Sequence, residues 1–403
     1  MEEKVKVTIQ YIEPKTGSSG TFEIEIYKTD EEFQEAFIEF FGKFLNSDNR
    51  SSFLELENPV MCNLKKAIHD YLTRTYLIPQ NEKFPQHDFL FNNLSMVSNF
   101  LLVRHLIFDA QKFIEWILEI TLEWEASNGN YRIHKGSLYF FWSRYAIINN
   151  EIDKGFFLIH KAYEEDCITQ NTDTPDTPAY KTVTLNKDER NLLFTYVSKL
   201  WGFLDMFIDS YNKENTKSLS QSSFESKFLL TPPSKDLLFT FTHTLARIHQ
   251  MFGIRTIITN SEFAGLFMLN LLFNLVLIID NYLYARSSNQ QNNNNSKFFE
   301  LAKNLLINSG IETNIDNCKR NLSNMNSETL DFDNKISMLL DRTYNFPAPI
   351  QKAPLYYDVC ICYCIRNHSA HNLSLSKTIA IRFHDICRSI LNVLFLSIEV
   401  YGD

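Results

Sequence analysis

The chain has 403 residues, of which 44% are hydrophobic, and a formal net charge of −9. A chain of this size and hydrophobicity can bury two or three sizeable cores, which excludes an intrinsically disordered protein. The acidic balance excludes a protein that coats nucleic acid broadly, because such binding requires many basic residues, but it leaves room for a local basic site. The 11 glycines form no GxGxxG, GxxxxGK[ST] or GxSxG motif. The sequence therefore lacks the usual motifs of nucleotide-binding loops and of the α/β-hydrolase nucleophile.

The cysteines and the start of the chain bear on location. Seven cysteines are spread at irregular spacing, and such an odd, irregular set does not form a disulfide framework. The first ten residues, MEEKVKVTIQ, are charged and predict no signal peptide. Both observations predict a reduced, cytoplasmic protein.

Residues 1–30 predict a β-hairpin. The stretches KVKVTIQYI and TFEIEIY alternate apolar and polar residues, as half-buried strands do. The sequence PKTGSSG between them is rich in turn-forming residues.

Residues 31–168 predict a helical N-terminal domain that acts as a sensor or interaction module. The stretch DEEFQEAFIEFFGKFL follows Thr29, the expected N-cap, and carries apolar residues at helical spacing. Residues 138–166 resemble one tetratricopeptide unit, with packing residues at Trp142, Ala146, Ile152, Gly155, Ile159 and Ala162. Only one copy is evident and such repeats need neighbours, so an ordinary helical hairpin fits at least as well.

Residues 169–189 predict a linker, because this part of the chain is rich in Thr, Asp, Asn and Pro. Residues 190–403 predict an all-helical bundle. Its expected helices are 190–211, 235–252, 261–286, 297–309, 353–371 and 375–400. The predicted fold class is therefore mainly α, with an N-terminal β-hairpin and helical domain ahead of a C-terminal all-α bundle.

One uncharged stretch, FAGLFMLNLLFNLVLII at 263–279, is close to the lower length limit for a membrane-spanning helix. Asn270 and Asn274 lie inside it, charged residues flank it closely, and no Lys/Arg cluster or Trp belt follows. These features predict a helix buried on all sides within the bundle and no membrane partner.

The stretch CYCIRNHSAHNL, residues 362–373, ends an apolar helix with one cation, one amide and two imidazoles. The negative end of the helix dipole attracts cations and histidines, which explains part of this pattern. An RNA-cleaving site explains more of it, because Arg366 is a forked cation that can hold a phosphate and His371 can move a proton near neutral pH. An ideal helix sets these two residues about 140° apart, so they share one site only if the helix end unwinds or a partner chain supplies a second motif.

Arg366, Asn367 and His371, set in RNHSAH between two long helices, resemble the motif of the HEPN superfamily, in which an Arg and a polar residue precede a His after a short spacer. The resemblance covers residues 190–403. It implies a HEPN-like helical bundle that cleaves RNA without a metal ion, as a homodimer whose two motifs meet at the subunit interface. It also implies that Arg366 binds and polarises the phosphate, that His371 acts on the ribose 2′-hydroxyl or the leaving 5′-oxygen, and that Asn367 orients one of these groups.

The same resemblance implies a 2′,3′-cyclic phosphate product, no cofactor, and a setting in bacterial defence or toxin systems. A sensing domain often accompanies such nucleases, so the N-terminal half is expected to bind a protein or nucleotide activator. In one branch of the superfamily a Tyr two places after the His is adenylylated by an antitoxin. That place is Leu373 here, so this form of control is not expected.

Five further residues are candidate RNA contacts. His368 lies inside the motif, either as a second proton carrier or as an exposed residue at the helix end. The others, on the next helix, are Lys377, Arg382, His384 and Arg388. His384 and Arg388 lie one turn apart and share a face, which fits either a strip that follows the phosphate backbone or a solvated basic face.

Two other groups near the motif, a Cys/His stripe and an aspartate, can be explained by a structural role alone. Cys360, Cys364 and His368 form an i, i+4, i+8 stripe, but zinc needs four convergent ligands, so the cysteines are expected to be buried apolar residues and no metal is expected. Asp280 either orients His371 or is a plain helix-end carboxylate.

Two functions therefore remain open. The first is a HEPN-type endoribonuclease with an N-terminal sensor, and the second is a non-catalytic helical module that binds RNA or protein. Loss of cleavage or toxicity in both Arg366→Ala and His371→Ala, while the dimer persists, favours the first. A fold in which either residue is buried and paired internally, far from any cleft or subunit interface, favours the second.

Overall fold

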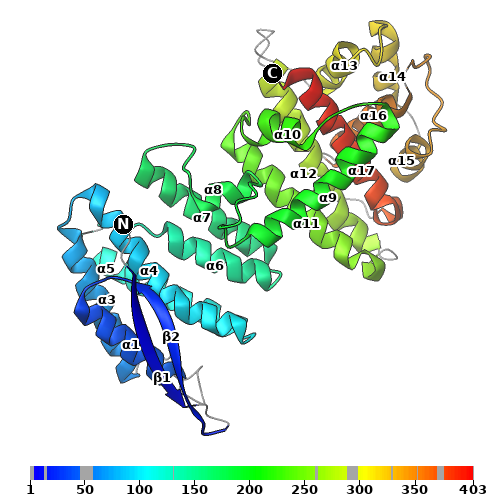
Figure 1. Cartoon of the computed structure of the whole chain (residues 1–403). Coiled ribbons are helices and arrows are strands. Elements are labelled where there is room, and N and C mark those ends of the chain that lie inside the picture. Colours follow the sequence, from blue (N-terminus) through cyan, green and yellow to red (C-terminus); the bar gives the residue numbers. More distant parts are fainter. Residues whose placement is uncertain are drawn as a thin grey trace. The chain divides into compact units, whose positions relative to one another are not determined.

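The computed structural model describes residues 4–12, 16–45, 58–129, 131–258, 262–287, 298–327, 330–351, 353–369 and 376–402. Within these ranges it leaves out the side chains of residues 11, 80–82, 254–258, 262–263, 287, 326–327, 353 and 369. The described residues are mainly helical, with a small antiparallel β-hairpin at the N-terminal end (Figure 1). The chain folds into two compact units, Met1–Tyr180 and Lys181–Asp403.

The predicted hairpin is confirmed. It pairs β1 (Lys4–Ile12) with β2 (Ser19–Tyr27) in an antiparallel register that sets Lys4 opposite Tyr27. The inward-facing isoleucines, among them Ile9, are buried against helices of the same unit. This cover matters because an isolated two-stranded hairpin is only marginally stable in water.

The helices of the first unit follow the hairpin. They are α1 (Glu31–Leu45), α3 (Pro59–Tyr76), α4 (Gln80–Val103), α5 (Ile107–Ser127), α6 (Gly136–Ile148) and α7 (Ile152–Gln170). A stripe of phenylalanines on α1, at helical spacing, forms much of the core: Phe33, Phe37, Phe40, Phe41 and Phe44. Each of these rings is no more than 1% exposed, so α1 is held mainly by the burial of one face.

The cap of α1 differs from the prediction. Asp30, and not Thr29, receives the backbone N–H of Phe33 on its side chain, at 2.9 Å. Asp30 is directly adjacent to the first helical residue, which is where an N-cap must lie to reach the third N–H of the helix. The expectation of Thr29 as the cap was therefore wrong by one residue.

The segment predicted as a tetratricopeptide unit or an ordinary hairpin forms the two helices α6 and α7, joined by a turn of three residues. Ala146, Ile159 and Ala162 are buried where these helices pack together. Gly155 allows the close approach, because a Cβ added there would lie 2.5 Å from a side-chain carbon of Ile147. The structure establishes a helical hairpin.

The expected linker at 169–189 contains ordered and buried structure. It includes the end of α7 and the short helix α8 (Pro178–Val183), which spans the boundary between the two units. Val183 and Leu185 are fully buried within the second unit. The sequence predicted a linker here because most of the stretch is polar, although these two apolar residues pack into the second unit.

The second unit is a helical bundle. Its elements are α9 (Phe194–Asn215), α10 (Gln221–Phe224), the π-helical turn η1 (Glu225–Leu229), α11 (Lys235–Ile258), α12 (Glu262–Ser287), α13 (Phe298–Asn308), α14 (Ile315–Ser327), α15 (Phe332–Leu340), α16 (Ala353–Ser369) and α17 (Lys377–Tyr401). The long helices α12, α16 and α17 pack against one another, and α15 packs against α16 and α17. The sequence did not predict α14 and α15.

Helix α12 carries the apolar stretch noted in the sequence. Over Ala264–Arg286 it is long and apolar enough to cross a membrane, and it is the one helix among the described residues that meets these criteria. Burial on all sides was predicted and is wrong: only 56% of its most apolar stretch is buried inside the bundle, and Phe267 and Asn270 are exposed. Core helices of soluble proteins meet the same criteria of length and composition.

Candidate functional site

The motif begins at the C-terminal end of α16. This helix is apolar on nearly all sides up to Ile365, which is fully buried. The next three residues, Arg366, Asn367 and His368, are half-buried. His371 and Leu373 fall in 370–375, outside the described residues.

Arg366 faces a carboxylate on α12. Its Nε lies 3.5 Å from Oδ2 of Asp280, and the two side chains are 33% and 19% exposed. This separation is longer than an ordinary charge-assisted hydrogen bond, so the contact is an ion pair with loose geometry. Among the described residues, no other group bonds to the guanidinium. Asp280 therefore touches Arg366, and its expected role toward His371 is not tested by the described residues.

The environment of Asp280 changes its titration. Burial raises the pKa of the Asp280 carboxyl above its usual value, and the nearby Arg366 guanidinium opposes that rise. The two effects compete because desolvation disfavours the charged form and an adjacent cation favours it. The ion pair therefore weakens when the pH falls far enough to protonate Asp280, which happens at a higher pH than for an ordinary aspartate.

His368 stacks on an aromatic ring. Its imidazole lies 3.7 Å, centroid to centroid, from the ring of Phe332 on α15, and the two planes are inclined by 13°. Burial lowers the pKa of His368, while the neighbouring Asp333 carboxylate opposes this shift. The residue is half-buried and oriented, in contrast to the exposed helix-end residue that was one of its two readings.

The start of α17 is fixed on the other side of the undescribed stretch. Ser376 caps α17 by accepting the backbone N–H of Ile379, and its hydroxyl donates to Oδ1 of Asp333 at 2.5 Å. Gly265 on α12 lies against the same residue, since a Cβ added there would lie 2.0 Å from the Ser376 carbonyl oxygen. His368 and Ser376, which lie on either side of the undescribed residues 370–375, thus both contact α15.

The basic residues of α17 lie among carboxylates. Arg382 donates through Nε to Asp385 at 2.8 Å and through Nη1 to Asp341 at 3.0 Å. Arg388 donates through Nη1 to Glu214 at 3.1 Å, and its Nη2 lies 3.7 Å from Asp385. The charges of both arginines are therefore largely balanced within the bundle, as in a structural ion-pair network.

His384 and Lys377 have different surroundings. The His384 ring lies against Phe207 and Phe252, at centroid distances of 5.6 and 5.2 Å, and its Nδ1 is 3.9 Å from an Asp385 oxygen. Lys377 is exposed in the first turn of α17, the end that follows the motif. Of the four predicted α17 contacts, Lys377 is the one that lies at the helix end next to the motif.

The cysteines of α16 are buried among apolar residues. Burial raises the pKa of the Cys360 thiol well above its usual value, and the Cys364 sulfur lies 3.9 Å from the Met325 sulfur. A thiol with a raised pKa stays protonated at neutral pH and is a poor metal ligand. In the described ranges, no three His, Cys, Asp or Glu residues are grouped so that they could hold a metal ion.

Comparison of the chain with protein-family models, with curated proteins and with solved structures finds no match. Chemical interpretation therefore depends on the residues themselves. The sequence did not point to Phe332, Asp333, Ser376 or Gly265 as neighbours of the motif. A signal for the first two was present, because Asp331 in DFDN is a good N-cap and its side chain receives the backbone N–H of Asn334.

Proposed function

We propose that the second unit is a metal-independent endoribonuclease of HEPN type, with Arg366, Asn367 and His371 as its catalytic residues. In this proposal the bundle α9–α17 is a HEPN-like domain and the first unit, with its tetratricopeptide-like hairpin, is a sensor that binds a protein or nucleotide activator. The protein would act as a homodimer in the cytoplasm, in a bacterial defence or toxin setting.

The observation that supports the proposal most is the environment of Arg366. The guanidinium lies at a helix end, one-third exposed, with Asp280 on its Nε side. A carboxylate at Nε limits the rotation of the side chain and leaves the two terminal nitrogens as donors for a second group. Two oxygens of a phosphate can accept parallel hydrogen bonds from these two terminal nitrogens.

The chemistry requires a proton carrier next to that phosphate. In the proposed reaction the ribose 2′-oxygen attacks the phosphorus and the bond to the 5′-oxygen breaks, which leaves a 2′,3′-cyclic phosphate and a 5′-hydroxyl. His371 takes the proton from the 2′-hydroxyl or gives one to the 5′-oxygen, and solvent water exchanges the other proton, so that the step balances. Asn367 orients one of these groups, and His368 and Lys377 contact the RNA beside the cleaved bond, with weaker contributions from Arg382, His384 and Arg388.

A second function has an observation in its favour. Arg366 pairs with Asp280, and Arg382 and Arg388 pair with carboxylates of the same unit. Arginines that are neutralised internally attract phosphate less strongly than free ones. This pattern favours a non-catalytic helical module that binds RNA or protein.

The nature of the RNA ends separates the two functions. Purified full-length protein is incubated with a mixed RNA pool in EDTA, and the fragments are tested for 2′,3′-cyclic phosphate ends. The proposal predicts such ends with wild type and none with His371→Ala. RNA that stays intact, although it binds to the protein with measurable affinity, supports the non-catalytic module.

A further inference from the structure

Helix α12 keeps one face in contact with solvent. The helices α11, α13, α16 and α17 pack against it. On the remaining face six residues are exposed or half-buried, and none of them is charged. We name them the α12 stripe: Phe267, Asn270, Asn274, Leu277, Asn281 and Tyr284. The exposed face of a helix ordinarily carries charged residues, so an uncharged stripe of this length is typical of a surface that a partner covers.

The spacing of the stripe is that of a seam between two helices. From Phe267 to Tyr284, successive members are separated alternately by three and four residues. This alternation keeps a stripe on one side of a helix, and it occurs where two helices pack side by side along their length. The helix rises about 26 Å over the stripe, so a second helix could contact it along about five turns.

The amides of the stripe are available to a partner. In the described part of the chain, the side chains of Asn270 and Asn274 form no hydrogen bond. Asn281 donates to the carbonyl of Leu277 at 2.8 Å, which leaves its amide oxygen as an acceptor. An amide both donates and accepts, so it can pair with the same group of another molecule. Two copies of the stripe would not repel each other, because it carries no charge.

The stripe is nearly symmetrical about its centre, which lies between Asn274 and Leu277. If two copies pack antiparallel about this centre, Phe267 faces Tyr284 of the second copy, and Asn270 faces Asn281 of the second copy. Aromatic residues then meet at both ends of the seam, and amides meet between the ends and the centre. A two-fold interface requires a surface that matches itself in this way.

We propose that the α12 stripe is the surface on which a second copy of the chain docks, antiparallel and about a two-fold axis between Asn274 and Leu277. The inference rests on the homodimer of the proposed function and names its interface. It does not depend on catalysis.

This arrangement brings the two motifs to one side of the dimer. Asp280 lies roughly 90° around the helix from the centre of the stripe, so it flanks the seam, and Arg366 pairs with it. A two-fold axis that relates antiparallel helices keeps corresponding flanks on the same side. The two Asp280 residues would then be about 14 Å apart along the helix direction, so both Arg366 side chains lie along one face of the dimer.

Disulfide cross-linking of the full-length protein tests the interface. Cys62→Ser and Cys167→Ser are introduced first, because the remaining cysteines are buried. Asn270→Cys combined with Asn281→Cys is expected to give a disulfide-linked dimer under mild oxidation. Neither substitution alone should do so, because each position lies about 16 Å from its own copy along the helix, beyond the reach of a disulfide. Gly202→Cys, at an exposed position of α9, controls for random collisions and should not cross-link.

Analytical ultracentrifugation measures the strength of the dimer. Asn274→Asp places two like charges near the two-fold axis and is expected to raise the dissociation constant of the dimer at least tenfold. Asn304→Asp, at a half-buried position of α13 outside the stripe, is the matched control and should leave this constant unchanged.

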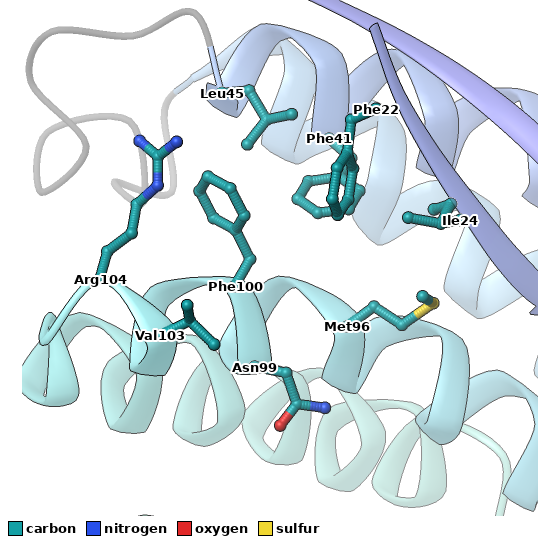
Figure 2. Close-up of a pocket in the computed structure, with 9 residues that line it drawn as sticks. All are labelled: Phe22, Ile24, Phe41, Leu45, Met96, Asn99, Phe100, Val103 and Arg104. Atoms are coloured by element: carbon teal, nitrogen blue, oxygen red, sulfur yellow. The ribbon is translucent and has the colours of Figure 1, made fainter.

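A different apolar surface, in the first unit, provides a second control. It is a pocket of about 440 Å³ between the hairpin, α1 and α4, and Val103 at its rim is 79% exposed (Figure 2). Val103→Asp adds a charge there and should leave the dimer intact. A dimer that Val103→Asp dissociates and Asn274→Asp does not would overturn the inference.

Three further results would also overturn it. The first is a dimer in which the paired cysteines do not cross-link, which leaves the nuclease proposal standing because the dimer then forms elsewhere. The second is cross-linking of the single variants as fast as the double variant, which means parallel packing. The third is a protein that stays monomeric and binds phosphatidylcholine vesicles until Asn274→Asp releases it. Absence of RNA cleavage in EDTA, together with the expected cross-link, refutes the nuclease and leaves this interface in place.

Discussion

The Nε atom of Arg366 lies 3.5 Å from Oδ2 of Asp280, which ties the end of α16 to α12. The pair connects the residue proposed to hold the scissile phosphate with a carboxylate of a core helix. Asp280 is therefore a positioning residue in the proposed site, since it acts on the substrate only through Arg366.

Asp280→Asn tests this role. The substitution keeps the shape of the side chain and removes the charge, so the guanidinium should lose its fixed orientation and RNA cleavage should slow by about 10- to 100-fold. The pH profile separates orientation from a simple loss of stability. In wild type, Asp280 takes up a proton at a higher pH than an ordinary aspartate does, because burial raises its pKa. Cleavage by Asp280→Asn should lack the corresponding acidic limb, and an unchanged pH profile would refute the role.

Gly265 is predicted to be intolerant of any side chain. A Cβ at this position would lie 2.0 Å from the Ser376 carbonyl oxygen, so Gly265→Ala must push the start of α17 away from α12. The expected loss in the free energy of unfolding is about 1–3 kcal/mol. Gly202→Ala in α9 is the matched control, because nothing lies within 4 Å of its Cβ, and it should stabilise the protein by up to about 1 kcal/mol. Equal denaturation midpoints for the two variants would show that the two helices do not approach this closely.

RNA affinity should depend unequally on the α17 cations. Lys377 is exposed in the first turn of α17, next to the motif, whereas Arg388 lies 11 residues further along the helix and is one-third exposed. Lys377→Gln should therefore weaken binding and reduce the slope of log affinity against log salt concentration by about one, while Arg388→Gln should change that slope less. The measurement is a series of fluorescence-anisotropy titrations with a labelled RNA at several salt concentrations. A larger change for Arg388→Gln would mean that its ion pairs open when RNA binds.

Acid should destabilise the first unit through two buried histidines. Burial lowers the pKa of His87 to about 3 and that of His134 to about 4, and no described residue bonds to Nε2 of His87. A histidine whose pKa is lowered by folding favours the folded state at pH values above its pKa in the unfolded chain, about 6.5. This contribution to the free energy of unfolding is lost as the pH falls below 6.5, because the unfolded chain then binds the proton more strongly than the folded protein does. At about pH 4.5 each imidazole should lower the free energy of unfolding by on the order of 2.5 kcal/mol relative to neutral pH.

Asp166, 3.6 Å from His134, acts in the opposite direction. Burial raises its pKa to about 7, so its contribution to stability is present at low pH and lost as the pH rises through that value. The net acid sensitivity is therefore smaller than the two histidines alone would give. Urea denaturation near neutral pH and at about pH 4.5 should show His87→Gln losing about 2.5 kcal/mol less than wild type. Parallel losses would mean that His87 is protonated in the folded protein.

Elements with a strong local pattern could be predicted from sequence, and contacts between distant residues could not. The alternating strands of β1 and β2 and the uninterrupted apolar run of α12 carry their own periodicity, and both were found where expected. Helix α15 was missed because it is short and its polar start hides the pattern. Its Phe332 and Asp333 are nevertheless the residues that orient His368 and bind Ser376.

The ion pairs of α17 show the same limit. Arg382 and Arg388 were predicted to form a basic strip, although one shared partner, Asp385, lies only three residues from each in the sequence. Their other partners are distant in the sequence. Arg382 pairs with Asp341, which follows α15 and is 41 residues away in the sequence. Arg388 pairs with Glu214 on α9, which is 174 residues away. Pairing at such separations is set by the packing of the bundle. Arg366 itself could be singled out, but its contact with Asp280 could not.

The central claim is that Arg366 acts on the scissile phosphate, and a single-turnover cleavage assay in EDTA tests it most directly. The assay compares wild type, Arg366→Gln and the matched control Arg190→Gln, which breaks another arginine–aspartate pair of the same unit, that of Arg190 with Asp188. The account predicts that Arg366→Gln loses at least about 100-fold in rate, the scale of one lost transition-state donor, while Arg190→Gln cleaves like wild type. Equal cleavage by Arg366→Gln and wild type would contradict the account.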